Sequence, residues 1–269
     1  MPAIDLARLK TQAARLAEKF DDPEVFQRDL NELLGFYTNH TLRTSQTTRR
    51  LSVPAFRTPR PVLRQIESEL ILFAENQPEK SVTLTNLLWE LNSLESRLLA
   101  AFLLGRIPSE TALPALGRLS TWLNQSIDQE IRIALVTSAL MRVRQENPQA
   151  FFAILEGWLA SPQTTSQIWG MQALIPLLQD PQFENLPAVF RILRPAVLAA
   201  GPVTQLELQA CLAALERVST TETISFLRDI LLANPRPMML RIIRRILPAL
   251  SEDLQAALRE LLREQDIRV

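Results

Sequence analysis

The chain has 269 residues, enough for one large domain or two small ones and for a sizeable buried core. Its 29 basic and 29 acidic residues balance, so no global field steers a charged partner, and a single cysteine excludes a disulfide framework within the chain. The apolar run 98–105 is far shorter than the roughly 20 residues that cross a bilayer. The N-terminus lacks the apolar segment of a secretory signal, so we expect a cytoplasmic protein without a membrane span.

The composition predicts an all-α fold. Only six glycines occur, and Leu, Ala, Arg, Glu and Gln, which are good helix formers, dominate. Apolar residues recur at helical spacing almost throughout, as in the series Leu206, Ala210, Ala213, Ala214 and Val218. We therefore expect helices over most of the chain and no strands.

The chain begins with helices near 3–20 and 22–36, followed by a polar connector. From there on, helix-start signals recur at intervals of 35, 35, 37, 39 and 30 residues. These starts are Thr58-Pro59, Ser93, Asp128, Thr165, Thr204 and Asn234-Pro235, and Glu207 completes a capping-box pattern with Thr204. Between them lie breaks near Gln77-Pro78, Pro108, Asn147-Pro148, Asn185 to Pro187, Ser219 and Ser251.

Helix pairs at this period are typical of HEAT-like units. The sequence predicts a right-handed α-solenoid of such repeats, an armadillo-type fold, over 58–269. Residues 1–57 form an N-terminal helix pair and a basic connector that continue the same domain. Within the solenoid, the helix of 93–105 is expected to be buried nearly all round, because middle helices pack against repeats on both sides.

A resemblance covers roughly residues 55–175. It is carried by the runs FRTPRPVLRQI, LLWELNSLESRLLAAFLLGRI, NPQAFFAILEGWLAS and SQIWGMQAL, in that order. These runs resemble the DNA alkylation repair glycosylases of HEAT-like architecture. The resemblance implies a concave cationic face that wraps duplex DNA and excises N3- or N7-alkylated purines. It also implies an active site made of a Trp, an Asp four residues later, an Arg on the next repeat and a further Trp.

The sequence departs from that active site at each position. Gln172 stands at the arginine position, Ala213 at the later tryptophan, and Gln129 and Ile133 at the Trp-Asp pair. A shifted match supplies Trp122 and Asp128 as the remaining catalytic candidates. Their spacing of six does not place them on one helical face, so we expect no base excision of the family's type.

Other chemistry is scarce. One histidine, His40, and one cysteine, Cys211, cannot assemble a zinc cluster, and no glycine-rich phosphate loop occurs, so no metal or cofactor is expected. Cys211 lies in an apolar helix and is expected in the core. Trp89, Trp158 and Trp169 fall on apolar helical positions and are expected there too, whereas Trp122, at a helix end, is the tryptophan expected to face a ligand.

The arginines are the remaining signal. Arg97 and Arg132 follow Ser93 and Asp128 by the same offset of four, and residues 33–66 hold six arginines and no acid. We expect residues 38–57 to be exposed, with Arg43, Arg49 and Arg50 near the mouth of the concave face. The positions expected to contact nucleic acid are Arg43, Arg49, Arg50, Arg57, Arg60, Arg97, Arg132, Gln172, Arg241 and Arg244. A competing interpretation pairs Arg97 with Glu95, Glu130 or a helix end.

These observations favour a binding module that engages duplex DNA through arginines without base excision. Two alternatives stay open. One is a protein–protein interaction scaffold that uses the same concave surface, and the other is an alkylpurine DNA glycosylase with a rearranged site. Net neutrality argues against strong binding, since sequence-independent affinity for DNA comes mostly from phosphate neutralisation.

Overall fold

The computed structural model describes residues 5–38, 53–233 and 236–266, with side chains to residue 263. These residues form helices joined by turns and short loops, and no strand occurs among them, as the composition predicts. Within the described parts, none of the helices combines the length and apolar character that crossing a membrane requires. The chain divides into two compact units, Met1–Pro148 and Gln149–Val269.

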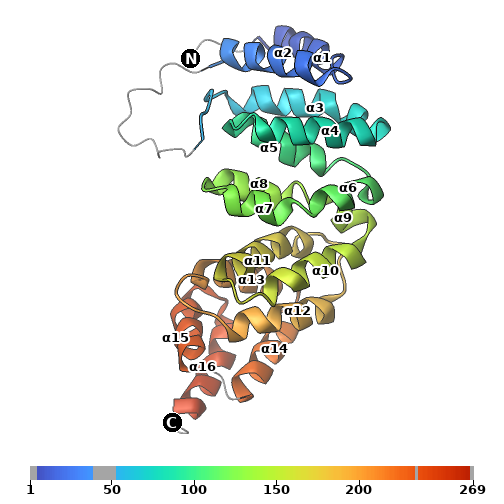
Figure 1. The fold of residues 1–269 in the computed structure, drawn as a ribbon. Helices are drawn as coiled ribbons and strands as arrows, with labels where there is room; N and C mark the ends of the chain where they lie inside the picture. Colours follow the sequence, from blue (N-terminus) through green and yellow to red (C-terminus); the bar gives the residue numbers. More distant parts are fainter. Residues whose placement is uncertain (1–4, 39–52, 234–235, 267–269) are drawn as a thin grey trace. The chain divides into compact units, whose positions relative to one another are not determined.

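In unit 1, alternate helices contact one another (Figure 1). Its helices are α1 (Leu6–Ala17), α2 (Pro23–Phe36), α3 (Arg60–Asn76), α4 (Pro78–Glu90), α5 (Leu94–Leu104), α6 (Ser109–Leu116), α7 (Leu119–Gln125), α8 (Gln129–Thr137) and α9 (Met141–Glu146). Contacts run from α1 to α3, α5 and α8 in one series, and from α2 to α4, α6 and α9 in the other. The most extensive contact joins α4 to α5, which connects the two series.

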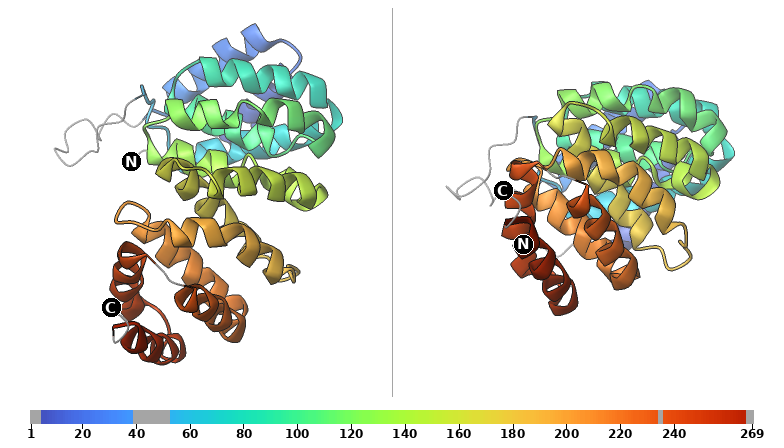
Figure 2. Two further views of the ribbon diagram at one scale, coloured as in Figure 1. Left: turned by 60° about the horizontal axis from the view of Figure 1, so that its bottom comes forward. Right: turned by 90° about the horizontal axis from the view of Figure 1, so that it is seen from below.

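Unit 2 repeats this pattern of contacts. Its helices are coloured from yellow-green to red in the two views of Figure 2. It contains α10 (Pro148–Leu159), α11 (Thr164–Leu178), α12 (Leu186–Leu198), α13 (Gln205–Val218), α14 (Thr220–Leu232), α15 (Pro237–Ile246), the 3-10 turn η2 (Leu247–Ala249) and α16 (Glu252–Asp266). One series of contacts runs through α11, α13 and α15, and the other through α12, α14 and α16.

Local sequence explains most helix starts. Prolines open α4 and α10 at the predicted breaks, where a missing N–H costs no hydrogen bond. Ser93 caps α5 as expected, and the side chain of Ser96 completes a reciprocal capping box. The described residues leave out Asn234-Pro235, and α15 begins at Pro237.

Two predicted starts and one predicted capping box were wrong in detail. The residue before α3 is Pro59 rather than Thr58, and α11 follows Gln163 rather than Thr165. Thr204 precedes α13, but its hydroxyl bonds the backbone N–H and carbonyl of Gly201 instead of capping the helix. The predicted capping box with Glu207 is therefore absent, because a turn three residues upstream takes up the threonine hydroxyl.

Helix α5 is buried nearly all round, as expected. Residues 98–104 are buried except Phe102, because α3, α4 and α8 all pack against this helix. Gly105 ends α5 at a close approach to the chain after α8. A Cβ built on Gly105 would lie 1.8 Å from the carbonyl oxygen of Ser138. The glycine therefore sets how near the ends of α5 and α8 can come.

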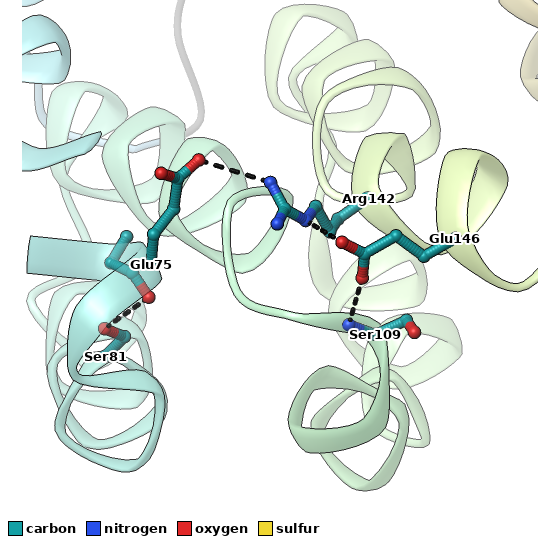
Figure 3. Close-up of polar contacts among 6 residues, drawn as sticks. Glu75, Ser81, Ser109, Arg142 and Glu146 are labelled. Atoms are coloured by element: carbon teal, nitrogen blue, oxygen red, sulfur yellow. Dashed lines mark hydrogen bonds and ion pairs between the residues drawn. The ribbon is translucent and has the colours of Figure 1, made fainter. Parts of the chain in front are cut away.

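A polar cluster connects α3, α6 and α9 inside unit 1 (Figure 3). Arg142 of α9 contacts Glu75 of α3 at 3.2 Å and also pairs with Glu146 one turn later. The other carboxylate oxygen of Glu146 accepts the backbone N–H of Ser109 at 2.9 Å, at the start of α6. That backbone hydrogen bond is the main reason why the pKa of Glu146 lies below its usual value, and Arg142 adds to the effect.

Candidate functional site

Three side chains stack together in unit 1, from α4, α5 and α7. The indole rings of Trp89 and Trp122 lie 4.5 Å apart, with planes only 9° from parallel. The guanidinium carbon of Arg97 lies 4.5 Å from the centre of the Trp89 ring. Trp89 is 2% exposed and Trp122 is 5% exposed. A cation and two offset aromatic faces attract one another in this arrangement, so the cluster fastens α5 and α7 to α4.

The expectation that Trp122 faces a ligand was therefore wrong. Its position near the end of α7 suggested exposure, but stacking on Trp89 removes the ring from solvent. Trp158 and Trp169 are buried, as expected, and their rings lie 6.0 Å apart, close to edge-on, within unit 2. All four tryptophans thus pack in cores.

Arg97 is held in a partly buried, electrostatically mixed setting. Burial is the largest influence on its guanidinium and lowers the pKa, while the carboxylates of Glu90 and Asp128 raise it. Its Nε is buried and makes no hydrogen bond within the described residues. The group stays protonated at physiological pH, because an arginine starts from a very high pKa. Arg97 thus sits against a tryptophan face, with acidic side chains near enough to influence its charge.

The two carboxylates considered as partners for Arg97 contact other groups. Glu95, 2% exposed, accepts the backbone N–H groups of Phe56 at 3.1 Å and Thr58 at 3.2 Å. Glu130 pairs with Arg60, whose side chain is largely exposed. The sequence missed both contacts because they join residues that lie 37 to 70 positions apart.

Glu95 fixes the end of the basic connector to unit 1. The carbonyl of Pro54 also accepts the N–H of Leu94 at 2.9 Å. Arg57 lies between the two bonded amides in a left-handed backbone conformation, with φ of 59°, and is half-buried. The other connector arginines named above, Arg43, Arg49 and Arg50, lie outside the described residues, as does His40.

The candidate catalytic residues straddle a helix boundary, as their spacing indicated. Trp122 lies inside α7, while Asp128 immediately precedes α8 and is half-buried. Gln172, at the family's arginine position, is half-buried on α11 and donates to Glu207 of α13 at 3.4 Å. No group of three or more His, Cys, Asp or Glu side chains that could hold a metal occurs in the described part of the chain. Cys211 is fully buried, and burial raises its pKa to about 12.

Exposed apolar side chains flank the start of α8. Ile127 is 74% exposed and Ile133 is 41% exposed. Arg132, half-buried, lies between them in the sequence, one residue before Ile133. Apolar side chains left in water near a helix start are a feature of contact surfaces, although isolated ones are common on any protein.

Two exposed arginines among the predicted positions lie in unit 2. Arg241 and Arg244 are three residues apart on α15, so they share one face of that helix, and both are exposed. Arg245 is exposed as well and donates to the side chain of Gln205 on α13 at 3.4 Å. Residues 236–250 contain four arginines and no acid.

A hollow of about 320 Å³ adjoins this surface. Its lining consists of Arg244, Leu247, Pro248, Arg259, Leu262 and Arg263. Arg244 was expected from the sequence, whereas Arg259 and Arg263 were not. The signal that could have found them is their spacing of four on α16, which places both on one face.

Comparison of the chain with protein-family models, with curated proteins and with solved structures found no match. A functional conclusion therefore depends on the chemistry of the side chains described above.

Proposed function

We propose that this chain is a HEAT-like repeat module, a right-handed α-solenoid related to the alkylation repair glycosylases, that binds duplex DNA without excising bases. The alternating helix contacts within each unit support a repeat architecture, since solenoid repeats contact only their neighbours. The runs quoted between residues 55 and 175 support the kinship.

The observation that carries the proposal is the arginine-rich helix α15, whose own sequence segment 236–250 contains no acid. Arg241, Arg244 and Arg245 are exposed there within a segment that holds no carboxylate. Guanidinium groups bind phosphate oxygens with two parallel hydrogen bonds, and phosphate neutralisation supplies most sequence-independent affinity for DNA. In unit 1 the predicted contacts are weaker candidates, because Arg60 pairs with Glu130 and Arg97 stacks on Trp89.

The absence of base excision follows from the setting of the candidate residues. Stabilising a cationic sugar requires a carboxylate and an aromatic wall that both reach the substrate. The ring of Trp122 is covered by Trp89, and Gln172 replaces the arginine that the family uses. Of the two candidate groups, Asp128 supplies a carboxylate, but the aromatic ring that should face the sugar is covered.

Titration of the full chain with a fluorescent duplex at about 50 and 200 mM salt tests the proposal. The double substitution Arg241→Ala, Arg245→Ala should weaken binding and reduce the slope of log affinity against log salt by about 0.9 per lost phosphate contact. The matched control, Arg217→Ala with Arg228→Ala, removes the same charge from exposed positions of α13 and α14. Equal slopes in the two double variants would reject the role of α15.

Release of 7-methylguanine or 3-methyladenine from methylated duplex tests the second half of the proposal. We expect release at the background depurination rate. Release above background that Asp128→Asn abolishes would overturn the proposal and establish a glycosylase with a rearranged site.

The exposed isoleucines at α8 favour a second function, a scaffold that binds a protein partner. Ile127 and Ile133 can bury apolar surface against a protein partner. Duplex DNA offers less apolar surface for such a contact. Duplex titrations without salt-dependent binding would favour this scaffold. In that case Ile127→Asp should abolish capture of the partner and leave the thermal unfolding temperature unchanged.

A further inference from the structure

We infer that the hollow lined by Arg244, Arg259 and Arg263 binds a terminal phosphate, a phosphomonoester carried on a nucleoside. The ligand is either the 5′-phosphorylated end of a strand or a free nucleotide, which share this chemistry. The inference rests on the proposed function in one respect, since Arg244 belongs to both surfaces. It goes further by naming the chemical class of phosphate, a terminal monoester, that the module binds in preference to internal phosphodiesters.

The lining combines converging positive charge with an apolar floor. Arg244 comes from α15, and Arg259 and Arg263 come from successive turns of α16. Leu247, Pro248 and Leu262 supply the apolar part, and the lining residues that the structure describes include no acidic side chain. Arg259 and Arg263 lie one turn apart on the same face of α16, so their positive charges repel each other. An anion that enters the hollow relieves that repulsion.

Contacts with uncharged acceptors orient part of this set. Nη2 of Arg259 donates to the side-chain oxygen of Gln255 at 2.6 Å, one turn earlier on α16. Nη2 of Arg244 donates to the backbone carbonyl of Leu262 at 3.4 Å. Each guanidinium has five N–H donors, so one such bond fixes the orientation of Arg259 and leaves further donors for a ligand.

The number of arginines favours a phosphomonoester over other anions. A carboxylate offers two oxygens in one plane, and an internal phosphodiester offers two free oxygens and one negative charge. A phosphomonoester offers three terminal oxygens and a charge of about −1.5 to −2 at neutral pH. Charge-assisted bonds from guanidinium groups in different directions therefore suit the monoester best.

The size of the hollow indicates that more than the phosphate enters. A volume of about 320 Å³ falls at the lower end of small-molecule sites and exceeds what a bare phosphate fills. The apolar floor of Leu247, Pro248 and Leu262 can contact the sugar or the face of the first base. We therefore assign the hollow to a nucleoside phosphate and not to inorganic phosphate alone.

The test uses the full chain and two duplexes that differ only in a 5′-phosphate or a 5′-hydroxyl at one end. The wild type should bind the phosphorylated duplex at least about tenfold more tightly, the net effect of about one charge-assisted hydrogen bond. In Arg259→Ala with Arg263→Ala, both duplexes should bind alike. The control Arg217→Ala with Arg228→Ala should retain the preference. Equal binding of both duplexes by the wild type would overturn the inference and leave the proposed function standing.

Two further experiments separate a strand end from a free nucleotide as the ligand and control for misfolding of the alanine variant. Adenosine 5′-monophosphate should compete with the phosphorylated duplex, whereas adenosine should not and inorganic phosphate should compete more weakly. If neither duplex binds, the nucleotide is titrated alone. Binding by the wild type that the double alanine variant loses would support the site with a free nucleotide as its ligand, and no binding by the wild type would reject the site. Arg259→Lys with Arg263→Lys keeps the charge and should still lose most of the preference, because lysine lacks the planar fork.

Discussion

Substitution of Gly105 by alanine tests the close approach of α5 and α8 directly. The glycine backbone has φ of −77°, a value that alanine adopts without strain, so the perturbation is confined to one added methyl group. That methyl carbon would lie 1.8 Å from the carbonyl oxygen of Ser138, 2.8 Å from its carbonyl carbon and 3.3 Å from Cα of Ala139. All three neighbours are backbone atoms, so no side chain can rotate away to make room.

The magnitude follows from the required displacement. Ordinary contact begins near 3.4 Å, so the chain after α8 must move from α5 by roughly 1.5 Å. Overpacking of a well-packed core costs about 1–3 kcal/mol, and a clash with backbone belongs at the upper end of that range. A domain of about 150 residues loses about 2–4 °C of melting temperature per kcal/mol. Gly105→Ala should therefore lower the transition of unit 1 by about 6–12 °C.

The assay is thermal unfolding followed by far-UV circular dichroism, with two alanine controls. An added Cβ meets no atom within 4 Å at Gly35 in α2 or at Gly157 in α10. Both controls should leave the protein as stable as before or more stable by about 0.5–1 kcal/mol, because alanine is the better helix former. The reasoning fails if Gly105→Ala melts within about 1 °C of these controls.

Three further predictions concern buried or hydrogen-bonded groups. Glu146→Gln should lower the free energy of unfolding by about 0.5–1 kcal/mol at pH 7, a discounted value because the carboxylate is partly exposed. Hydrogen bonding lowers the pKa of Glu146 in the folded state. The difference in unfolding free energy between wild type and variant should therefore be complete above the pKa of the unfolded chain, near 4.3, and vanish as the pH falls through the folded pKa. Urea titrations at several pH values measure this difference. The thiol of Cys211, with its pKa near 12, should resist iodoacetamide at pH 8 until denaturant is added, and rapid labelling of the native protein would contradict its burial. Arg97→Ala should cost about 1–2 kcal/mol in urea unfolding and change the tryptophan emission of Trp89, whereas an unchanged emission would contradict the stack.

The sequence predicted the features that depend on neighbouring residues. Ser93 begins α5, and the prolines Pro78 and Pro148 open their helices, because capping and the missing proline N–H act within one turn. The burial of α5 on all sides was predictable from the unbroken apolar run 98–104. Helix starts could therefore be derived to within a few residues over the described part of the chain, except those of α7 and α9, before which no break was predicted.

Contacts between distant residues could not be derived in this way. The stack that buries Trp122 needs Trp89 from another helix, and the two lie 33 positions apart in the sequence. The same holds for Glu95 at the start of α5, which the sequence offered as a partner for Arg97 but which binds the backbone of Phe56 and Thr58. A charged side chain at a helix start has several physical uses, and only the fold selects among them.

The setting of each arginine decides which of them can serve a phosphate partner. An arginine that already contacts a carboxylate must exchange that contact for the phosphate, so the net gain is small and screened by salt. Arg142, between Glu75 and Glu146, is the clearest case in unit 1. Arg241 on α15 is the contrasting case, because it is exposed in a segment without acids. Alanine at Arg142 should therefore lower stability with little effect on the salt dependence of binding, and alanine at Arg241 should do the reverse. If both substitutions changed the salt slope equally, internal pairing would not explain which arginines bind.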